Sequence, residues 1–109
     1  MMSKLCKISD CLTSIEGLSV THYWHPRLVA PYCLWAEDGE GDSLHTNNKK
    51  TEQVITGTID YFTLHEFDEN VDKIQEALNN VECLGWTLNS VQYEDETNLI
   101  HYEWRWELA

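Results

Sequence analysis

Basic residues are scarce in this chain. Seven Lys and Arg residues stand against nineteen Asp and Glu residues, which gives a formal net charge of -12. Proteins that hold a phosphate backbone do so largely with Lys and Arg, so this balance argues against a nucleic-acid clamp. It suits instead a surface that nucleic acid passes without sticking, and we expect no specific nucleic-acid binding.

Long apolar runs are missing as well. No stretch approaches the roughly 18–20 apolar residues that span a bilayer. The N-terminal residues lead into an amphipathic segment rather than a continuous apolar signal region. We therefore expect a soluble, intracellular protein without membrane association.

The four cysteines form no Cys-x-x-Cys pair. Cys6 and Cys11 lie on an expected helix, whereas Cys33 and Cys83 stand alone in apolar stretches. Free cysteine packs as a small hydrophobic residue, so we interpret these residues as buried thiols. Their spacing favours neither a disulfide framework nor a structural zinc site.

Recognisable catalytic motifs are also lacking. His65-Glu66 begins like a zinc-binding His-Glu-x-x-His helix, but position 69 is Glu and the second histidine is absent. The chain contains no Gly-x-Ser-x-Gly elbow and no glycine-rich phosphate loop. Four acidic residues could in principle hold a divalent ion: Asp60, Asp68, Glu69 and Asp72. Most of them sit where a helix N-terminus favours acids, so we expect no catalytic, metal-binding or cofactor-binding residues and no enzyme.

What the chain does contain is enough apolar material for one core. Its 109 residues, 42% hydrophobic and 11% aromatic, are expected to form a single domain over residues 1–109. Helical spacing predicts a helix over 4–16, capped by Ser3 and followed by Gly17 in the left-handed region. A second helix is predicted over 69–80, preceded by Asp68.

Strands are predicted around these helices. Short strands are expected near 20–24 and over 32–36, and the longest strand over 53–64. The last quarter reads as a hairpin of 86–93 and 99–108, in which aromatic and charged residues alternate with a period of two. A change of parity near Asn89 predicts a β-bulge. The expected fold is α+β, an antiparallel sheet of about four strands with two helices on one face.

Two sets of residues are candidates for contacts with other proteins. The segment 37–50 shows no periodicity and is expected to be a long polar loop, either an ordinary surface hairpin or a projecting arm. Its candidate assembly residues are Glu37, Asp38, Glu40, Asp42, His45, Lys49 and Lys50. The charged face of the last strand is the second candidate, formed by His101, Glu103, Arg105 and Glu107.

Parts of the sequence resemble a known family. These are the run 32–37, the segment 54–63 with its following helix, and the ending 91–97 through 101–104. They resemble the small tail-completion or tail-terminator proteins of long-tailed bacteriophages and prophages, over about residues 30–109. The resemblance does not extend to residues 20–30.

The resemblance implies a non-enzymatic structural protein of the virion. Such a subunit forms a homo-oligomeric ring, often a hexamer, that caps the tail tube and contacts other tail or head-completion proteins. It would be found in the bacterial cytoplasm during assembly and at the head–tail junction of the virion. A ring needs two different patches per subunit, because its contacts are heterologous.

Two other interpretations remain open. The chain could be a small-molecule or peptide-binding module of a bacterial protein, with Trp24, Trp35 and Tyr61 lining a pocket. It could also be a small metal-dependent enzyme that uses His22, His25 and a carboxylate.

Overall fold

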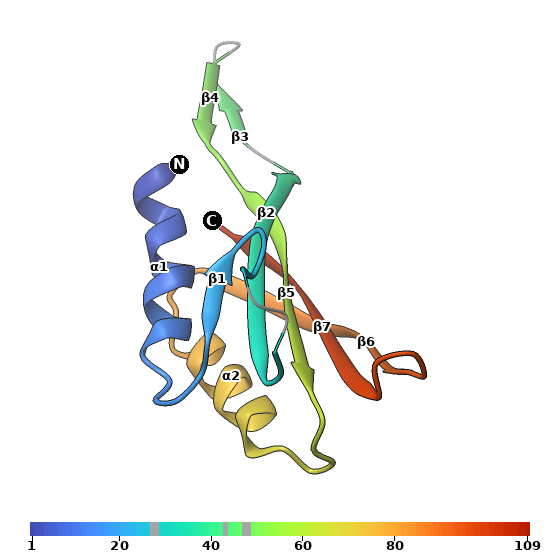
Figure 1. The fold of residues 1–109 in the computed structure, drawn as a ribbon. Coiled ribbons are helices and arrows are strands. Elements are labelled where there is room, and N and C mark those ends of the chain that lie inside the picture. Colours follow the sequence, from blue (N-terminus) through green and yellow to red (C-terminus); the bar gives the residue numbers. More distant parts are fainter. Residues whose placement is uncertain (27–28, 43, 47–48) are drawn as a thin grey trace.

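The chain folds around one five-stranded sheet, shown by a computed structural model that describes residues 1–26, 29–42, 44–46 and 49–109 (Figure 1). For 44–46 and 49–51 only the backbone is described. The elements, in order, are α1 (Met2–Thr13), β1 (Val20–His22), β2 (Tyr32–Glu40), β3 (Leu44–Thr46), β4 (Lys49–Glu52), β5 (Ile55–Thr63), α2 (Glu69–Asn79), β6 (Leu84–Glu94) and β7 (Leu99–Leu108).

The predicted α+β class is confirmed, but the sheet differs from the expected one. It has five strands in the order β1-β2-β5-β7-β6, not four. It is also mixed, because β1 pairs with β2 in parallel, through Val20 and Cys33 to His22 and Trp35. A three-residue strand carries too little periodicity to reveal its direction.

The C-terminal hairpin lies in the same sheet as β5, as predicted. The expectation that this strand is the longest was wrong, because β5 has 9 residues, β6 has 11 and β7 has 10. β7 is antiparallel to both β5 and β6. The β6–β7 register shifts between Leu88 and Ser90, which confirms the bulge expected from the change of parity. Trp86 and Leu88 thereby share a side of the sheet with Val91 and Tyr93.

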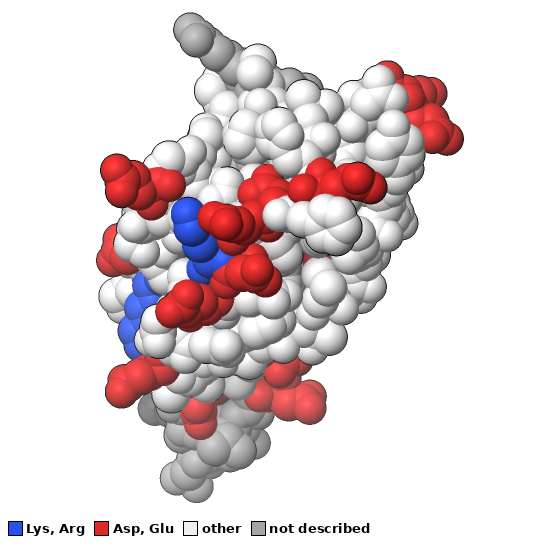
Figure 2. Space-filling model, turned by 90° about the horizontal axis from the view of Figure 1, so that it is seen from below, with Lys and Arg blue, Asp and Glu red and all other residues white. Residues whose placement is uncertain are grey.

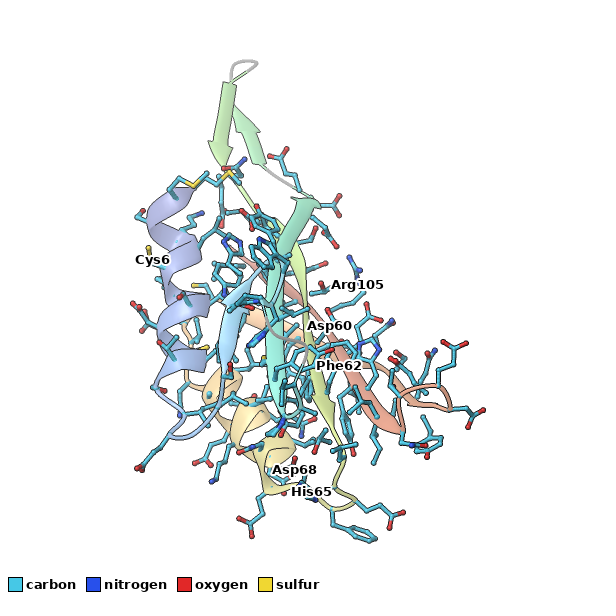
Figure 3. All side chains as sticks on the ribbon, in the orientation of Figure 1. Cys6, Asp60, Phe62, His65, Asp68 and Arg105 are labelled. Atoms are coloured by element: carbon cyan, nitrogen blue, oxygen red, sulfur yellow. The ribbon has the colours of Figure 1, made fainter. Side chains whose placement is uncertain are left out.

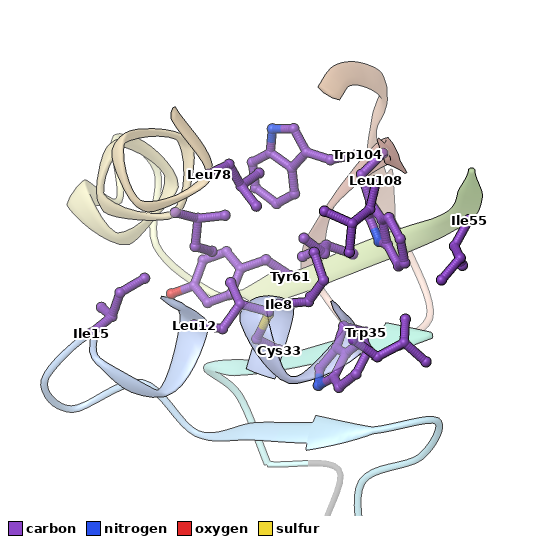
Figure 4. Close-up of a cluster of buried hydrophobic side chains, with 14 residues drawn as sticks. Ile8, Leu12, Ile15, Cys33, Trp35, Ile55, Tyr61, Leu78, Trp104 and Leu108 are labelled. Atoms are coloured by element: carbon purple, nitrogen blue, oxygen red, sulfur yellow. The ribbon is translucent and has the colours of Figure 1, made fainter. Parts of the chain in front are cut away.

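Both helices pack on one side of this sheet (Figure 1). The core combines apolar residues of α1 and α2 with large rings from the strands, among them Trp35, Tyr61 and Trp104 (Figure 4). Trp106 belongs to the same cluster. Trp104 and Trp106 are almost wholly buried. Six of the twelve Trp, Tyr and Phe residues therefore lie in the core or pack against it, because large rings bury much apolar area in a small domain.

The helix ends agree only partly with the sequence. Gly17 has the expected left-handed conformation, with a φ of +80°, but α1 ends at Thr13 with Ser14 as its C-cap, before the predicted end at residue 16. Ser3 is not the cap, because α1 begins at Met2 with Met1 before it and no side-chain cap. Asp68 caps α2 as its position suggested.

The expectation of four buried thiols was partly wrong. Cys33 is fully buried and Cys11 is half-buried, and burial raises the pKa of the Cys11 thiol to about 11. Cys6 and Cys83 are exposed, Cys6 on α1 (Figure 3). All four are free.

The described part of the segment 37–50 is more regular than the aperiodic loop that was expected, and it forms a hairpin, one of the two alternatives left open. β2 continues through Glu40, and β3 pairs with β4 in a separate two-stranded sheet. We call the segment 42–53 the arm. Its described residues, which include β3 and β4, project beyond the rest of the subunit between the end of β2 and the start of β5 (Figure 1). The molecule measures 52 × 26 × 24 Å overall.

Candidate functional site

The predicted strand face lies on the side of the sheet opposite the helices, which we call the open face. Alternation along β7 places four side chains there: His101, Glu103, Arg105 and Glu107. The register sets them beside outward residues of β5, so that His101 neighbours Phe62 and Glu103 neighbours Asp60. Asp60, Phe62 and Arg105 all lie on this side in Figure 3.

His101 is held between two carboxylates on the open face. Its Nε2 lies 2.7 Å from Asp60 Oδ1, and its Nδ1 lies 3.4 Å from Glu94 Oε1. Only the protonated imidazole donates from both nitrogens. The hydrogen bond to Asp60 raises the pKa of His101; burial opposes this, and the negative charges of Asp60, Glu94 and Glu103 add to it.

We expect this raised pKa to make the stability pH-dependent. A group whose pKa is raised on folding stabilises the native state fully below its unfolded pKa, about 6.5 for histidine. That contribution is lost as the pH rises through the folded pKa of His101. Urea unfolding between about pH 6 and pH 9 should therefore show a decline that His101→Gln removes.

Asp60→Asn is the second variant in this experiment. It keeps the imidazole but removes its main anionic partner, so it should flatten the same decline. An unchanged pH profile in both variants would contradict the proposed role of the pair.

Aromatic rings continue across the open face from His101. The His101 ring stacks on Phe62 at a centroid distance of 4.2 Å, and Phe62 stacks on Tyr32 at 4.6 Å. His25 lies against Tyr32 at 5.2 Å. The open face thus carries a row of rings flanked by carboxylates, rather than a purely solvated row of charges.

The structure brings the two predicted sets together at one point. Arg105 Nη2 lies 3.1 Å from Asp38 Oδ2, and Thr56 Oγ1 donates to Asp38 Oδ1 at 2.8 Å. The β2–β5 register shifts between Glu37 and Gly39, next to this contact. Both charged partners are substantially exposed, so the pair contributes about 0–1 kcal/mol.

Glu37 is tied into the edge of the sheet instead of projecting. Its Oε1 lies 2.6 Å from His22 Nε2, and the His22 ring stacks between Tyr23 and Trp35 at 3.9 Å from each. Burial alone would raise the pKa of Glu37. Hydrogen bonds from its own N–H, His22 and Tyr23 outweigh burial, and the pKa is lowered.

The remaining candidate assembly residues fall into two groups. Glu40 and Asp42 are exposed at the base of the arm. The backbones of His45, Lys49 and Lys50 lie in β3 and β4, but their side chains lie outside the described residues.

The pocket expected for a small-molecule or peptide-binding module does not form. Trp35 and Tyr61 are buried in the core, whereas Trp24 is 68% exposed on the surface. The three rings therefore share no cavity.

The two histidines proposed for a metal site have other partners. His22 bonds to Glu37, and His25 Nε2 lies 2.6 Å from Ser19 Oγ. Within the described residues no group of three or more His, Cys, Asp or Glu side chains is placed to hold a metal ion.

A polar cluster around Asp68 was not predicted from the sequence (Figure 3). Its Oδ2 accepts from Tyr61 Oη at 2.6 Å and from Thr63 Oγ1 at 2.7 Å, and its Oδ1 accepts from the Asn70 N–H at 2.9 Å. Burial raises the pKa of Asp68, but these three donors outweigh it and the pKa is lowered. Asp68 therefore caps α2 and also ties this helix to side chains of β5. The sequence indicated only the cap.

We expect Asp68→Ala to lower the free energy of unfolding by about 1–3 kcal/mol, because it removes the cap and takes away the acceptor of the Tyr61 and Thr63 hydroxyl groups. A lowered pKa stabilises the fold above the unfolded pKa of about 3.9, and this contribution is lost as the pH falls through the folded pKa. Urea unfolding at pH 7 and at acid pH measures both effects. Equal losses at both pH values would contradict this assignment.

The surface of the molecule is predominantly acidic. Figure 2 shows many acidic side chains and few basic ones on the face seen from below. Neither helix of the described chain is long and apolar enough to cross a membrane. Comparison of the sequence with protein-family models and with curated proteins finds no match.

Proposed function

We propose that this chain is a non-enzymatic subunit of a phage or prophage tail, a tail-completion or terminator protein that forms a ring at the head–tail junction. The observation that carries the proposal is the arm, which extends from the end of β2 and β5 past the body of the subunit (Figure 1). A projecting arm that docks on a different surface of the next copy is the heterologous contact that closes a ring.

The sheet edges support the same proposal. One edge is formed by the short strand β1 and by the part of β2 beyond Trp35, along which no further strand of the described chain is added. The other edge is the long strand β6. Two unlike edges offer different surfaces at the two sides of one subunit. An isologous dimer would instead need one self-complementary patch.

The charge of the protein fits a passage for DNA. With a net charge of -12, the lining of a ring built from this subunit repels the phosphate backbone rather than holding it. DNA would then move through the opening without being bound. The proposed partners are further copies of the chain and the tail and head-completion proteins on either side of the ring.

Sedimentation velocity over a concentration series tests this function. We expect one discrete, closed oligomer, such as a hexamer, to grow at the expense of the monomer as the concentration rises. A monomer at all concentrations, or a continuous distribution of open oligomers, would contradict the proposal.

A further inference from the structure

An apolar shelf lies on the helix side of the sheet, beyond the reach of α2. Phe67 is 95% exposed there, Tyr93 60%, Val91 51% and Leu88 40%. Phe67, Val91 and Tyr93 line a hollow of about 530 Å³ together with Glu66, Gln92, Ile100 and Tyr102. We call this surface the β6 shelf.

Phe67 is held in an unusual conformation at this shelf. Its φ is +56°, in the left-handed region that bulky residues rarely adopt. Burial does not offset this strain, because the ring is almost wholly in water. Backbone strain of this kind at an exposed apolar residue is typical of binding surfaces.

The shelf adjoins an open sheet edge. β6 pairs with β7 on one side, and no other strand of the described chain pairs with its outer side. Long edge strands are usually protected by charged residues or proline. β6 has neither before Glu94, and the interval between Glu82 and Glu94 is the longest in the sequence without Asp, Glu, Lys, Arg or His. The bulge at Leu88 is its one protective feature, and it leaves residues 90–94 free to pair beside the shelf.

Acidic residues surround the shelf and indicate what binds there. Glu66 lines the hollow, no basic residue does, and Glu94, Asp95 and Glu96 form the adjacent β6–β7 turn. A second copy of this chain would bring its own acidic ends against these residues, because β6 is flanked by acids at both ends. A partner that carries Lys or Arg beside an apolar strand is electrostatically complementary.

We propose that the β6 shelf binds an extended segment of another protein, with apolar side chains at alternate positions and basic residues at its ends. The segment adds a strand to residues 90–94 of β6. Its apolar side chains cover Phe67, Val91 and Tyr93, and its polar side chains face the open side. This inference does not use the arm. It assigns the β6 edge to a different partner, so that the proposed ring would close through the arm and the edge formed by β1 and β2.

The test uses the full chain and the synthetic peptide Lys-Lys-(Val-Thr)4-Lys-Lys, labelled with fluorescein, in a fluorescence-anisotropy titration. We expect saturable binding with a Kd below about 1 mM. The Kd should rise as salt is added. The same peptide with Glu in place of Lys should bind at least about tenfold more weakly.

Two lysine variants locate the site. Val91→Lys places a charge on the shelf and should weaken binding of the Lys peptide about tenfold or more. Thr87→Lys adds the same charge to an exposed position of the same strand, but on the open face, and should change the affinity less than about twofold.

The remaining outcomes overturn the inference. They are no binding of the Lys peptide, equal binding of both peptides, or equal effects of the two lysine variants. Sedimentation of wild type and Val91→Lys without peptide adds one more. If wild type sedimented as a dimer and Val91→Lys as a monomer, the occupant of the shelf would be a second copy of the chain. If wild type bound the peptide but formed no ring, only the proposed function would be refuted.

Discussion

Replacing Gly57 with alanine is expected to lower the free energy of unfolding by about 3 kcal/mol or more. A Cβ atom at this position would overlap the ring of Trp106 and the carbonyl oxygen of Ala36. Neither neighbour is free to move, because Trp106 is 1% exposed and Ala36 belongs to the paired strand β2. Gly57 thus allows the Trp106 ring to lie directly on β5. Urea unfolding monitored by tryptophan fluorescence measures the loss.

Gly85→Ala is the matched control for this prediction. Gly85 also lies in a strand of the same sheet, but a Cβ there would have no atom within 4 Å. We expect its stability to be unchanged or slightly higher, because alanine reduces the freedom of the unfolded chain. A similar decrease in the free energy of unfolding of both variants would contradict this prediction, because it would show that contact with Trp106 is not what requires glycine at position 57.

Removal of the arm is expected to abolish ring formation while the subunit stays folded. The Gly41 N–H donates to the Val54 carbonyl oxygen at 2.9 Å, so these residues already form a hairpin pair. An Asn-Gly turn in place of residues 42–53 would close the β2–β5 hairpin with favourable geometry. The core lies outside the arm, so the subunit should stay folded. Light scattering should report the mass of a monomer.

Lys4→Met is the control for the arm deletion. The deletion also removes the hydrogen bond from Lys4 Nζ to the Gln53 carbonyl oxygen, 2.9 Å long. That bond contributes about 1–2 kcal/mol, and Lys4→Met removes it while the arm stays in place. We expect Lys4→Met to form rings. Rings in the arm-deleted protein would show that the arm is an ordinary surface hairpin.

The C-terminal half of the fold is predictable from the sequence because its strands are long and one-sided. Ile100, Tyr102, Trp104 and Trp106 alternate with charged residues, and this pattern suffices to define a half-buried strand. The bulge near Asn89 follows from parity alone. Such strands must bury one face, so their place in a common sheet follows as well.

The N-terminal part is less predictable because tertiary contacts decide it. β1 has three residues, and no motif in the sequence indicates that it pairs in parallel with β2. The arm has no face against the core, so its strands β3 and β4 lack the alternation that marks a buried strand. The sequence therefore showed only a long polar segment.

The candidate surfaces needed the register of the sheet. Asp60 and His101 are far apart in sequence, and their contact exists because β5 and β7 pair with one particular alignment. The contact between Asp38 and Arg105 depends in the same way on the irregular β2–β5 register. The charges were visible in the sequence, whereas their partners were not.

Electron microscopy of the purified chain, negatively stained at the concentration where sedimentation shows the oligomer, tests the assembly function most directly. We predict closed rings of one size with a central opening, seen end-on in class averages. Particles of monomer size alone, or open filaments without closure, would contradict the account.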